Sequence, residues 1–381
     1  MGLVGNWNYP TRIRFGSGRI TELAEACTDA GIRRPLLVTD RGLANLPITA
    51  RVLEIMEGAG LGRSIFSDVD PNPVDKNLEN GSRAFLDGDF DGVIAMGGGS
   101  GLDLAKLIAF ASRQTRPVWD FEDVGDNWTR ADAEAIAPVV AIPTTAGTGS
   151  EVGRAAVVTN SGTHAKKIIF HPRMMPSVVI CDAELTIDLP PAMTAGTGMD
   201  AFVHCLEAYC APAYHPMAQG VALEGIRLVK EFLPRAFRDG SDIEARANMM
   251  SAAAMGATAF QRGLGAIHSL AHAIGALHNT HHGTTNAVLT PAVLRFNRPA
   301  VETQIDRLAA YLGIPDGFDG FHAFVVELNR ELRIPENLRA LGADTGRIEE
   351  YAKLAIVDPT APGNPVPLTL DAAIALYEKA I

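Results

Sequence analysis

The hydrophobic pattern of the chain changes once, near residue 187, and this change limits the possible folds more than any other feature. Before it, short β-type runs alternate with helical patterns, which is typical of βαβ units and a mainly parallel sheet. The runs expected to form strands are Arg12–Phe15, Pro35–Asp40, Ser64–Val69, Gly92–Gly97, Pro138–Thr144, Lys166–Phe170 and Ser177–Asp182.

Helical periodicity dominates after the paired prolines Pro190 and Pro191. The expected helices are Thr194–Tyr209, Gln219–Leu233, Ile243–Phe260, Val301–Leu312 and Leu370–Lys379. Because the boundary is a change of period and not a flexible linker, we expect two closely packed domains with a cleft between them. The prediction is an α/β domain over residues 1–186 and an all-helical domain over residues 187–381.

Charge and composition exclude several classes of function. The chain has 33 Lys and Arg against 44 Asp and Glu, so its net charge is −11, and we expect neither a nucleic-acid nor a membrane partner. The longest apolar stretch, near Ala135–Ile142, is interrupted by Pro138 and is far shorter than the roughly 20 residues of a membrane helix. The N-terminal residues show no export signal, which predicts a cytoplasmic protein. Reduced thiols are expected, since no CxxC spacing occurs among Cys27, Cys181, Cys205 and Cys210.

A run of glycines stands between a strand-like and a helical segment. Val93–Met96 leads into Gly97–Gly101, and Leu102–Phe110 then has a helical pattern. Such a turn presents backbone N–H groups and the positive end of a helix dipole to an anion, and a pyrophosphate suits it. A tight turn without a ligand is the alternative. The usual dinucleotide pattern GxGxxG is absent from the chain.

Two further segments could contact a dinucleotide. The loop Ile142–Glu151 is rich in threonine and glycine, and its hydroxyls and amides suit ribose, phosphate or carboxamide, although such residues also occur in ordinary turns. Asp40 ends a strand, where a carboxylate can bind ribose hydroxyls and repel a 2′-phosphate. This favours NAD, while the adjacent Arg41 leaves NADP possible. Asp40 precedes the glycine run, so the topology is not the usual Rossmann one.

The histidines are strongly clustered. Five of the ten lie within fifteen residues, namely His268, His272, His278, His281 and His282. On a helix, residues four apart share a face, as His268 and His272 do, and as Asp200 and His204 do. A single histidine on an apolar helix is usually a core residue, but several imidazoles and a carboxylate would each need a buried partner. One divalent cation satisfies all of them, and these donors suit Fe²⁺ or Zn²⁺. Three neutral imidazoles and one carboxylate leave a charge of +1, which would stabilise an alkoxide.

The motifs together resemble those of one family, the iron-containing (group III) alcohol dehydrogenases. The segment Gly97–Lys106 resembles the family pattern GGGSxxDxAK. The other matching segments are Pro143–Glu151, Gly198–His204, Ile267–His272 and His282–Gly283, and the resemblance runs from Phe15–Gly18 to Asn364–Pro365. It implies an N-terminal dinucleotide-binding α/β domain and an all-α C-terminal domain, a fold similar to that of dehydroquinate synthase.

The resemblance also implies roles for individual residues. The four metal ligands would be Asp200, His204, His268 and His282. His272, the second histidine of the family's HxxxH motif, would be a catalytic proton relay or a group that supports the ligands from behind. The cofactor-binding residues expected from the motifs are Asp40, Asn72, Gly97, Gly98, Gly99, Ser100, Asp103, Thr144, Thr145, Thr148 and Lys167. His281 and His278 depart from the family pattern, and either adds a polar group to the substrate pocket or caps a helix end.

The implied reaction is hydride transfer between NAD(P)⁺ and a small primary or secondary alcohol, diol or hydroxy acid, in a homodimer or larger homo-oligomer. The expected cofactors are NAD, with NADP possible, and Fe²⁺, with Zn²⁺ possible. A maleylacetate reductase or a glycerol dehydrogenase of the same superfamily is the enzymatic alternative. A metal- or nucleotide-binding sensor is the non-enzymatic one, and it would have no reason to keep both the glycines and the histidines.

Overall fold

The computed structural model describes residues 11–163 and 165–381 of the protein. The described chain divides into two compact units. The first comprises residues 11–145 and 149–188, and the second comprises residues 146–148 and 189–381. The break after Asp188 lies two residues beyond the boundary expected from the sequence, and the short segment 146–148 belongs to the second unit.

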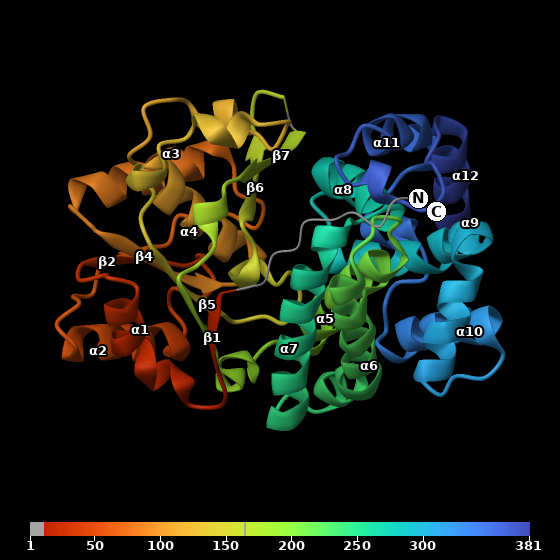
Figure 1. Ribbon diagram of the computed structural model, residues 1–381, viewed down its shortest axis with the longest axis horizontal. Coiled ribbons are helices and arrows are strands. Elements are labelled where there is room, and N and C mark those ends of the chain that lie inside the picture. The colour runs from red at the N-terminus through yellow and green to blue at the C-terminus, as the bar shows by residue number, and fades with distance from the viewer. Residues whose placement is uncertain (1–10, 164) are drawn as a thin grey trace. The chain divides into compact units, whose positions relative to one another are not determined.

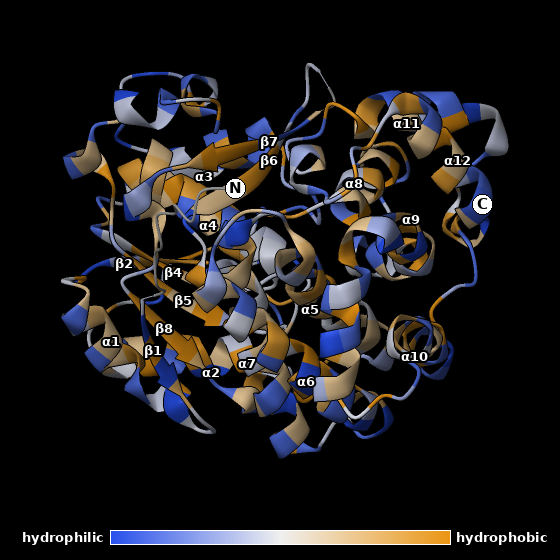
Figure 2. Ribbon diagram, turned by 45° about the vertical axis from the view of Figure 1, so that its right-hand side comes forward, coloured by the Kyte–Doolittle hydropathy of each residue, from blue (hydrophilic) through white to orange (hydrophobic). Residues whose placement is uncertain are grey.

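A parallel sheet forms the centre of the first unit, with the strand order β1-β8-β5-β4-β2-β3 (Figure 1). Its strands are β1 (Arg12–Phe15), β2 (Pro35–Val38), β3 (Ile65–Phe66), β4 (Gly92–Gly97), β5 (Val139–Pro143) and β8 (Val178–Cys181). The inner strands β2, β4, β5 and β8 are buried along their whole length, as expected for a parallel sheet covered by helices on both faces. Figure 2 shows β4 and β5 as largely hydrophobic.

Helices cover the sheet and complete the core of the first unit. They are α1 (Leu23–Asp29), α2 (Pro47–Gly58), α3 (Asp75–Asp87) and α4 (Gly99–Ala111). Leu23 of α1 and Val52 of α2 pack in one buried cluster with Ile94, Val140 and Ile180 of the sheet. Helix α4 packs on β4, and α3 packs on α4. The parallel α/β fold expected from the sequence is therefore confirmed.

Two strand predictions were inaccurate. The run expected at Ser64–Val69 shortens to the two residues of β3, because the chain then turns so that Asp68 and Asp70 bind side-chain amides of α3. The run at Lys166–Phe170 is part of β7 (Ala165–Phe170), which lies outside the main sheet. It pairs antiparallel with β6 (Ala155–Asn160), a strand that the sequence analysis missed.

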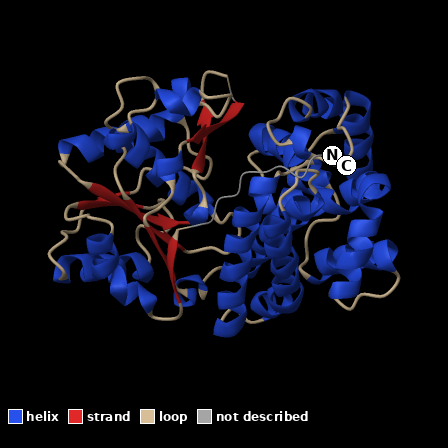
Figure 3. Cartoon of the chain, viewed as in Figure 1, coloured by secondary structure: helices blue, strands red, loops and turns tan. Residues whose placement is uncertain are grey.

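Among the described residues of the second unit, Figure 3 shows helices and the loops that connect them, and no strand. Its helices are α5 (Pro191–Cys210), α6 (Pro216–Arg238), α7 (Ile243–Ala259), α8 (Ala266–His278), α9 (His282–Tyr311), α10 (Gly317–Glu331), α11 (Ile348–Ala355) and α12 (Leu370–Ala380). Helix α5 is buried over almost its whole length and packs against α6, α7 and α9. In the part of the chain that the structure describes, no helix has the length and apolarity needed to cross a membrane.

Helix α9 is much longer than the helix expected at Val301–Leu312, because it continues through Pro291 and Pro299. Proline cannot donate a backbone hydrogen bond to the carbonyl four residues earlier. For Pro291 that carbonyl belongs to Ala287, and the Asn329 side chain of α10 donates to it at 2.7 Å instead. A side chain distant in sequence thus compensates for the proline.

Candidate metal centre and cofactor-binding loop

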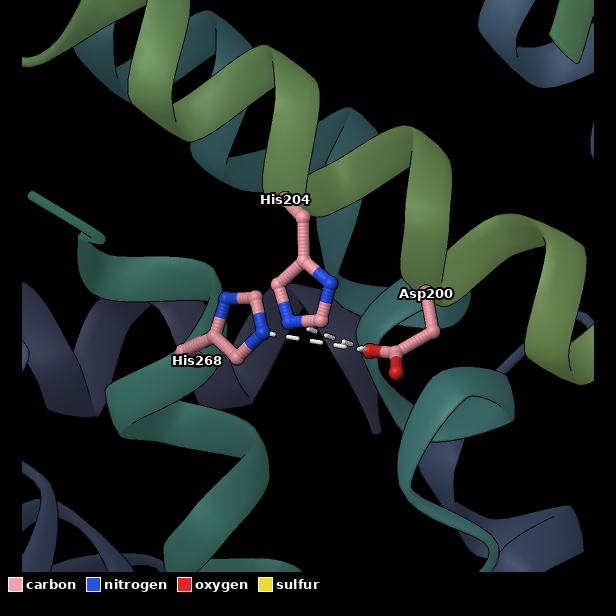
Figure 4. A group of neighbouring side chains, drawn as sticks. All are labelled: Asp200, His204 and His268. Atoms are coloured by element: carbon pink, nitrogen blue, oxygen red, sulfur yellow. Dashed lines mark ion pairs between the residues drawn. The ribbon is translucent and has the colours of Figure 1, made fainter. Parts of the chain in front are cut away.

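Helices α5 and α8 bring three potential metal ligands together. Asp200 and His204 lie one turn apart on α5 and therefore share a face, and His268 projects from α8 toward them (Figure 4). The Asp200 Oδ1 atom lies 3.9 Å from His204 Nε2 and 3.8 Å from His268 Nε2. All three side chains are buried. Their ligand atoms lie within 4.8 Å of one another, which is a separation that one ion can bridge.

His282, the first residue of α9, lies beside this group. Its Nε2 is 3.4 Å from the same Asp200 oxygen, and its side chain is 30% exposed. Nitrogen and oxygen ligands about 2.1 Å from a tetrahedral ion are about 3.4 Å apart. The observed separations of 3.4–3.9 Å are close to this value, whereas most are too long for hydrogen bonds. The donor set therefore fits a divalent ion such as Fe²⁺ or Zn²⁺.

Glycines allow the helices to approach closely enough to form this group. A Cβ atom at Gly283 of α9 would lie 2.0 Å from the Gly196 carbonyl oxygen and 2.8 Å from the Asp200 Cβ on α5. A Cβ at Gly256 of α7 would lie 2.9 Å from the His204 Cβ. Larger residues at these positions would separate the helices and hence the ligands.

Two polar residues beside the cluster were missed from the sequence. Glu207 lies three residues after His204 on α5, and its Oε2 is 2.7 Å from His268 Nδ1. Asn286 lies four residues after His282 on α9, and its Nδ2 donates to Asp200 Oδ1 at 2.8 Å. Both spacings place the residue on the same helix face as a ligand, a signal that the sequence contained.

The two inner histidines have opposite electrostatic surroundings. Burial lowers the pKa of His204 to about 4, with the Asp200 carboxylate opposing the shift, so this imidazole is neutral at pH 7. Burial also acts to lower the pKa of His268, but the hydrogen bond and charge of Glu207 outweigh it and raise the pKa overall.

His272 lies one turn after His268 and is held by a carboxylate. Its Nδ1 is 2.9 Å from Asp358 Oδ2, and its ring stacks on that of His282 with centroids 5.2 Å apart. The other Asp358 oxygen accepts a hydrogen bond from the Thr360 backbone N–H at 2.9 Å. Burial acts to raise the pKa of Asp358, but its bonds to His272 and Thr360 lower it overall. These bonds therefore favour the charged form of the Asp358 carboxylate, which faces Nδ1 of the His272 ring.

His278 and His281 do not join the cluster. His281 caps the N-terminus of α9, where its Nδ1 accepts a hydrogen bond from the Thr284 backbone N–H at 3.3 Å. His278 is the last residue of α8, and its Nε2 lies 2.7 Å from the Tyr351 hydroxyl. Of the two roles considered from the sequence, helix capping is the one observed for His281.

In the first unit, the glycine run forms the expected turn between a strand and a helix. Gly97 ends β4 with a φ of 146°, a conformation that L side chains rarely adopt. Gly98 caps α4, and a Cβ there would lie 3.2 Å from the Thr145 side chain, so Thr145 lies against the turn. The Thr144 N–H donates to the Gly97 carbonyl at 3.0 Å. Gly99 and Ser100 begin α4, where free N–H groups can bind an anion.

Asp40 lies close to this turn. It follows β2, which pairs directly with β4, so both groups lie at neighbouring carboxyl ends of the sheet. The chain proceeds from β2 to one side of the sheet and from β4 to the other, and ligands of parallel sheets bind where the strand order reverses. Asp40 Oδ1 accepts a hydrogen bond from the Leu43 N–H at 2.9 Å. The adjacent Arg41 contacts Asp68 and lies 3.1 Å from Asp70.

Several other predicted cofactor residues have protein partners. The Asp103 carboxylate accepts hydrogen bonds from the Ser150 hydroxyl and the Val157 N–H, and Lys167 Nζ lies 2.7 Å from Glu122. The Ser100 hydroxyl donates to the Pro71 carbonyl, next to Asn72. Thr148 belongs to the helical unit, so the structure does not group it with the glycine turn.

Comparison with known proteins gives consistent matches over the whole chain. The iron-containing alcohol dehydrogenase family matches residues 10–183, and the C-terminal region of the Fe-containing alcohol dehydrogenases matches residues 194–381. The chain is 39% identical to 4-hydroxybutyrate dehydrogenase of Cupriavidus necator over 94% of each protein. The structure is similar to that of 1,3-propanediol oxidoreductase, with a TM-score of 0.94, 33% identity and 99% coverage of both chains. It is also similar to sulfoacetaldehyde reductase of Bifidobacterium kashiwanohense in complex with NAD⁺, with a TM-score of 0.90, 27% identity, and coverage of 100% of this chain and 99% of that one.

Proposed function

Because this chain belongs to the iron-containing alcohol dehydrogenase family, we propose that it reversibly transfers a hydride between a small primary or secondary alcohol and NAD⁺. The observation that supports this most directly is the buried group of Asp200, His204 and His268, whose donor atoms have the spacing of metal ligands. The same chain carries a glycine turn suited to a pyrophosphate. A sensor of metal alone would need only the group of ligands, and a sensor of nucleotide alone would need only the glycine turn.

The proposed metal ligands are Asp200, His204, His268 and His282, holding Fe²⁺, with Zn²⁺ able to occupy the same donors. When bound, the ion supplies Lewis-acid chemistry that lowers the pKa of an alcohol oxygen, and the nicotinamide supplies the hydride acceptor. His204 is suited to its role because it is neutral at pH 7, with its pKa near 4. Asn286 holds the carboxylate of Asp200 in place through its 2.8 Å bond.

His272 is the proposed proton acceptor. Asp358 binds its Nδ1 at 2.9 Å, and a neutral imidazole with a proton on Nδ1 has a free lone pair on Nε2. That nitrogen could receive the alcohol proton, and the Asp358 carboxylate would stabilise the resulting imidazolium. The arrangement resembles a base held in position by a carboxylate in other enzymes.

For the cofactor, we propose that backbone N–H groups at the start of α4 bind the pyrophosphate and that Asp40 binds the adenosine ribose. Two carboxylates, Asp68 and Asp70, already neutralise Arg41. Its charge is therefore not free for a 2′-phosphate, which favours NAD over NADP. Asn72, Asp103, Thr144, Thr145, Thr148 and Lys167 complete the proposed cofactor residues.

The substrate is proposed to be a small alcohol with a second polar group, such as a diol or an ω-hydroxy acid. The names of two relatives, 4-hydroxybutyrate dehydrogenase and 1,3-propanediol oxidoreductase, support this class.

We further propose a cytoplasmic homodimer or larger homo-oligomer. Light scattering of the purified protein would test the oligomeric state.

The test is an activity screen of protein purified without oxygen and analysed for its metal content. Ethanol, 1,3-propanediol and 4-hydroxybutyrate are each supplied with NAD⁺ or NADP⁺ while NADH or NADPH absorbance is recorded. We expect NAD⁺-dependent oxidation that requires the metal. If the protein contains metal but oxidises none of these alcohols, a sensor is favoured. If it reduces maleylacetate without metal, a maleylacetate reductase is favoured.

A further inference from the structure

Glu207 is a buried carboxylate directly behind one of the proposed metal ligands. We propose that Glu207 is a positioning residue that holds His268 in the tautomer whose Nε2 can bind the ion, and that it thereby sets the metal affinity of the protein. This inference rests on the proposed metal centre. It concerns a residue outside the proposed set of ligands.

Each oxygen of Glu207 has a defined partner. Its Oε2 lies 2.7 Å from His268 Nδ1 and accepts a hydrogen bond from the Gly265 N–H at 2.9 Å. Its Oε1 accepts a hydrogen bond from the Ile267 N–H at 2.7 Å. Backbone N–H groups can only donate, so both oxygens of Glu207 act as hydrogen-bond acceptors.

This arrangement decides which nitrogen of His268 carries the proton. A carboxylate can only accept, so Nδ1 of His268 must be the N–H donor in the 2.7 Å bond. A neutral imidazole has a single N–H, and Nε2 then keeps a lone pair. That atom faces Asp200 Oδ1 at 3.8 Å, on the side of the proposed ion. A carboxylate behind a ligating histidine also raises the basicity of the imidazole, so that its other nitrogen binds a metal ion more strongly.

The same carboxylate fixes the position of helix α8. Gly265 is the N-cap of α8, and Glu207 binds its N–H together with that of Ile267 in the first turn. The N–H between these two, on Ala266, donates to Asn364 Oδ1 at 3.1 Å. A negative charge at a helix N-terminus is also favourable for the helix dipole. Glu207 therefore holds both the ring of His268 and the helix that carries it.

Replacing the carboxylate by an amide tests the tautomer directly. In Glu207→Gln, one acceptor oxygen becomes an NH₂ group that faces a donor. Either His268 changes tautomer and turns an N–H toward the ion, or a buried N–H loses its partner. Both outcomes weaken metal binding, and loss of such a partner of a ligand typically costs 10- to about 100-fold in affinity.

Asp182 provides a matched control in the other unit. It is buried and, like Glu207, has three hydrogen-bond partners, but all three are backbone N–H groups, those of Gly18, Ile20 and Glu184 at 3.1, 3.0 and 3.0 Å. No histidine is among these partners. Asp182→Asn is therefore expected to lower stability without changing the affinity for metal.

The measurement is competition for Zn²⁺ between the full-length protein and a chelator, with no substrate or dinucleotide present. We expect Glu207→Gln to bind Zn²⁺ about 10- to 100-fold more weakly than the wild type, and Asp182→Asn to bind it equally well. A Glu207→Gln protein that is folded and binds Zn²⁺ as tightly as the wild type would overturn the proposal.

If Glu207→Gln does not fold, ¹⁵N NMR of the zinc-loaded wild-type protein decides instead. The proposal requires His268 with a proton on Nδ1 and zinc on Nε2, and the reverse assignment overturns it. Failure of the proposed function is distinguishable, because affinity is measured without catalysis. If His268→Ala binds Zn²⁺ as tightly as the wild type, the proposed metal centre itself is wrong.

Discussion

Arg41 follows Asp40 at the end of β2, next to the proposed ribose site. Its guanidinium contacts Asp68, and another of its nitrogens lies 3.1 Å from Asp70. The hydrogen bond from Arg41 is the main cause that lowers the pKa of Asp68, so the pair stays charged at neutral pH. Arg41 left NADP possible in the sequence analysis, but in the structure these two carboxylates neutralise its charge.

Releasing Arg41 should change cofactor preference. In the double variant Asp68→Asn and Asp70→Asn, the ratio of kcat/KM for NADP⁺ to that for NAD⁺ should rise roughly fivefold, because an exposed ion pair with a 2′-phosphate contributes about 1 kcal/mol. Glu79→Gln, which removes an acid 3.4 Å from Lys76 on the same unit, is the control. An unchanged ratio in the double variant would show that Arg41 does not face the ribose.

Glu151 should make stability depend on pH. Burial raises its pKa from 4.5 to about 7, with Lys106 opposing the shift. A carboxyl with a raised pKa binds its proton more tightly when folded, so its contribution is present below pH 4.5 and lost as the pH rises through 7. Over this range the free energy of unfolding of the α/β unit should fall by roughly 3 kcal/mol through this group. Urea denaturation of the wild type and Glu151→Gln checks this, and equal pH slopes would contradict it.

The four proposed metal ligands lie in compact sequence motifs, and the resemblance to the family selected them from the larger group of clustered histidines. Glu207 and Asn286 carried the same kind of signal, since each lies one helical turn from a ligand. Spacing alone, however, does not say which neighbouring helix a side chain will meet. The partner of Glu207 is on α8, about sixty positions away, and only the tertiary structure reveals it.

At the scale of elements, the crossing of α5 and α9 positions the proposed metal centre. The two helices touch at Gly196 and Gly283, and a Cβ at Gly283 would lie 2.0 Å from the Gly196 carbonyl oxygen. The crossing places Asp200 Oδ1 3.4 Å from His282 Nε2. The sequence showed these glycines beside the ligands but did not show that they face each other.

A methyl group at this crossing should damage both stability and metal binding. Gly283→Ala is expected to lower the free energy of unfolding by about 1–3 kcal/mol through overpacking and to weaken Zn²⁺ affinity. Gly220→Ala on α6, where a Cβ would meet nothing within 4 Å, should instead stabilise the protein by up to about 1 kcal/mol. Denaturant titration and chelator competition measure the two effects. A Gly283→Ala protein with unchanged Zn²⁺ affinity would show that helix spacing does not control the site.

Element boundaries were less predictable than element types. The sequence predicted only the last part of α9, because Pro291 normally interrupts a helix. The bond from Asn329 to the Ala287 carbonyl, which makes the longer helix possible, comes from a different helix. Such compensation depends on tertiary structure and leaves no local pattern.

At the scale of the whole molecule, the change of period near residue 187 was sufficient to predict an α/β part and a helical part. It could not predict that residues 146–148 belong to the helical unit. A Cβ at Gly147 would lie 2.8 Å from the Thr197 carbonyl oxygen on α5, so this segment packs closely on that helix. The contact joins residues about fifty positions apart, and no periodicity indicates it.

Metal removal should affect the two units differently. The proposed ligands come from α5, α8 and α9, so a bound ion links three helices of the second unit. At a free-ion concentration of 100 times Kd, binding stabilises the folded state by about 2.7 kcal/mol. Calorimetry with and without a chelator should therefore shift the transition of the helical unit to lower temperature on metal removal. If the chelator lowered the transition temperature of His268→Ala as much as that of the wild type, this prediction would be contradicted.

The central claim is that one divalent ion at Asp200, His204, His268 and His282 supports NAD-linked alcohol oxidation. The most direct measurement adds Fe²⁺ without oxygen to metal-free protein and records NADH formation from 1,3-propanediol against the ratio of metal to protein. We predict that activity rises to a break at one ion per chain and that Asp200→Ala stays inactive at every ratio. Full activity in the metal-free protein, or wild-type activity in Asp200→Ala, would contradict the account.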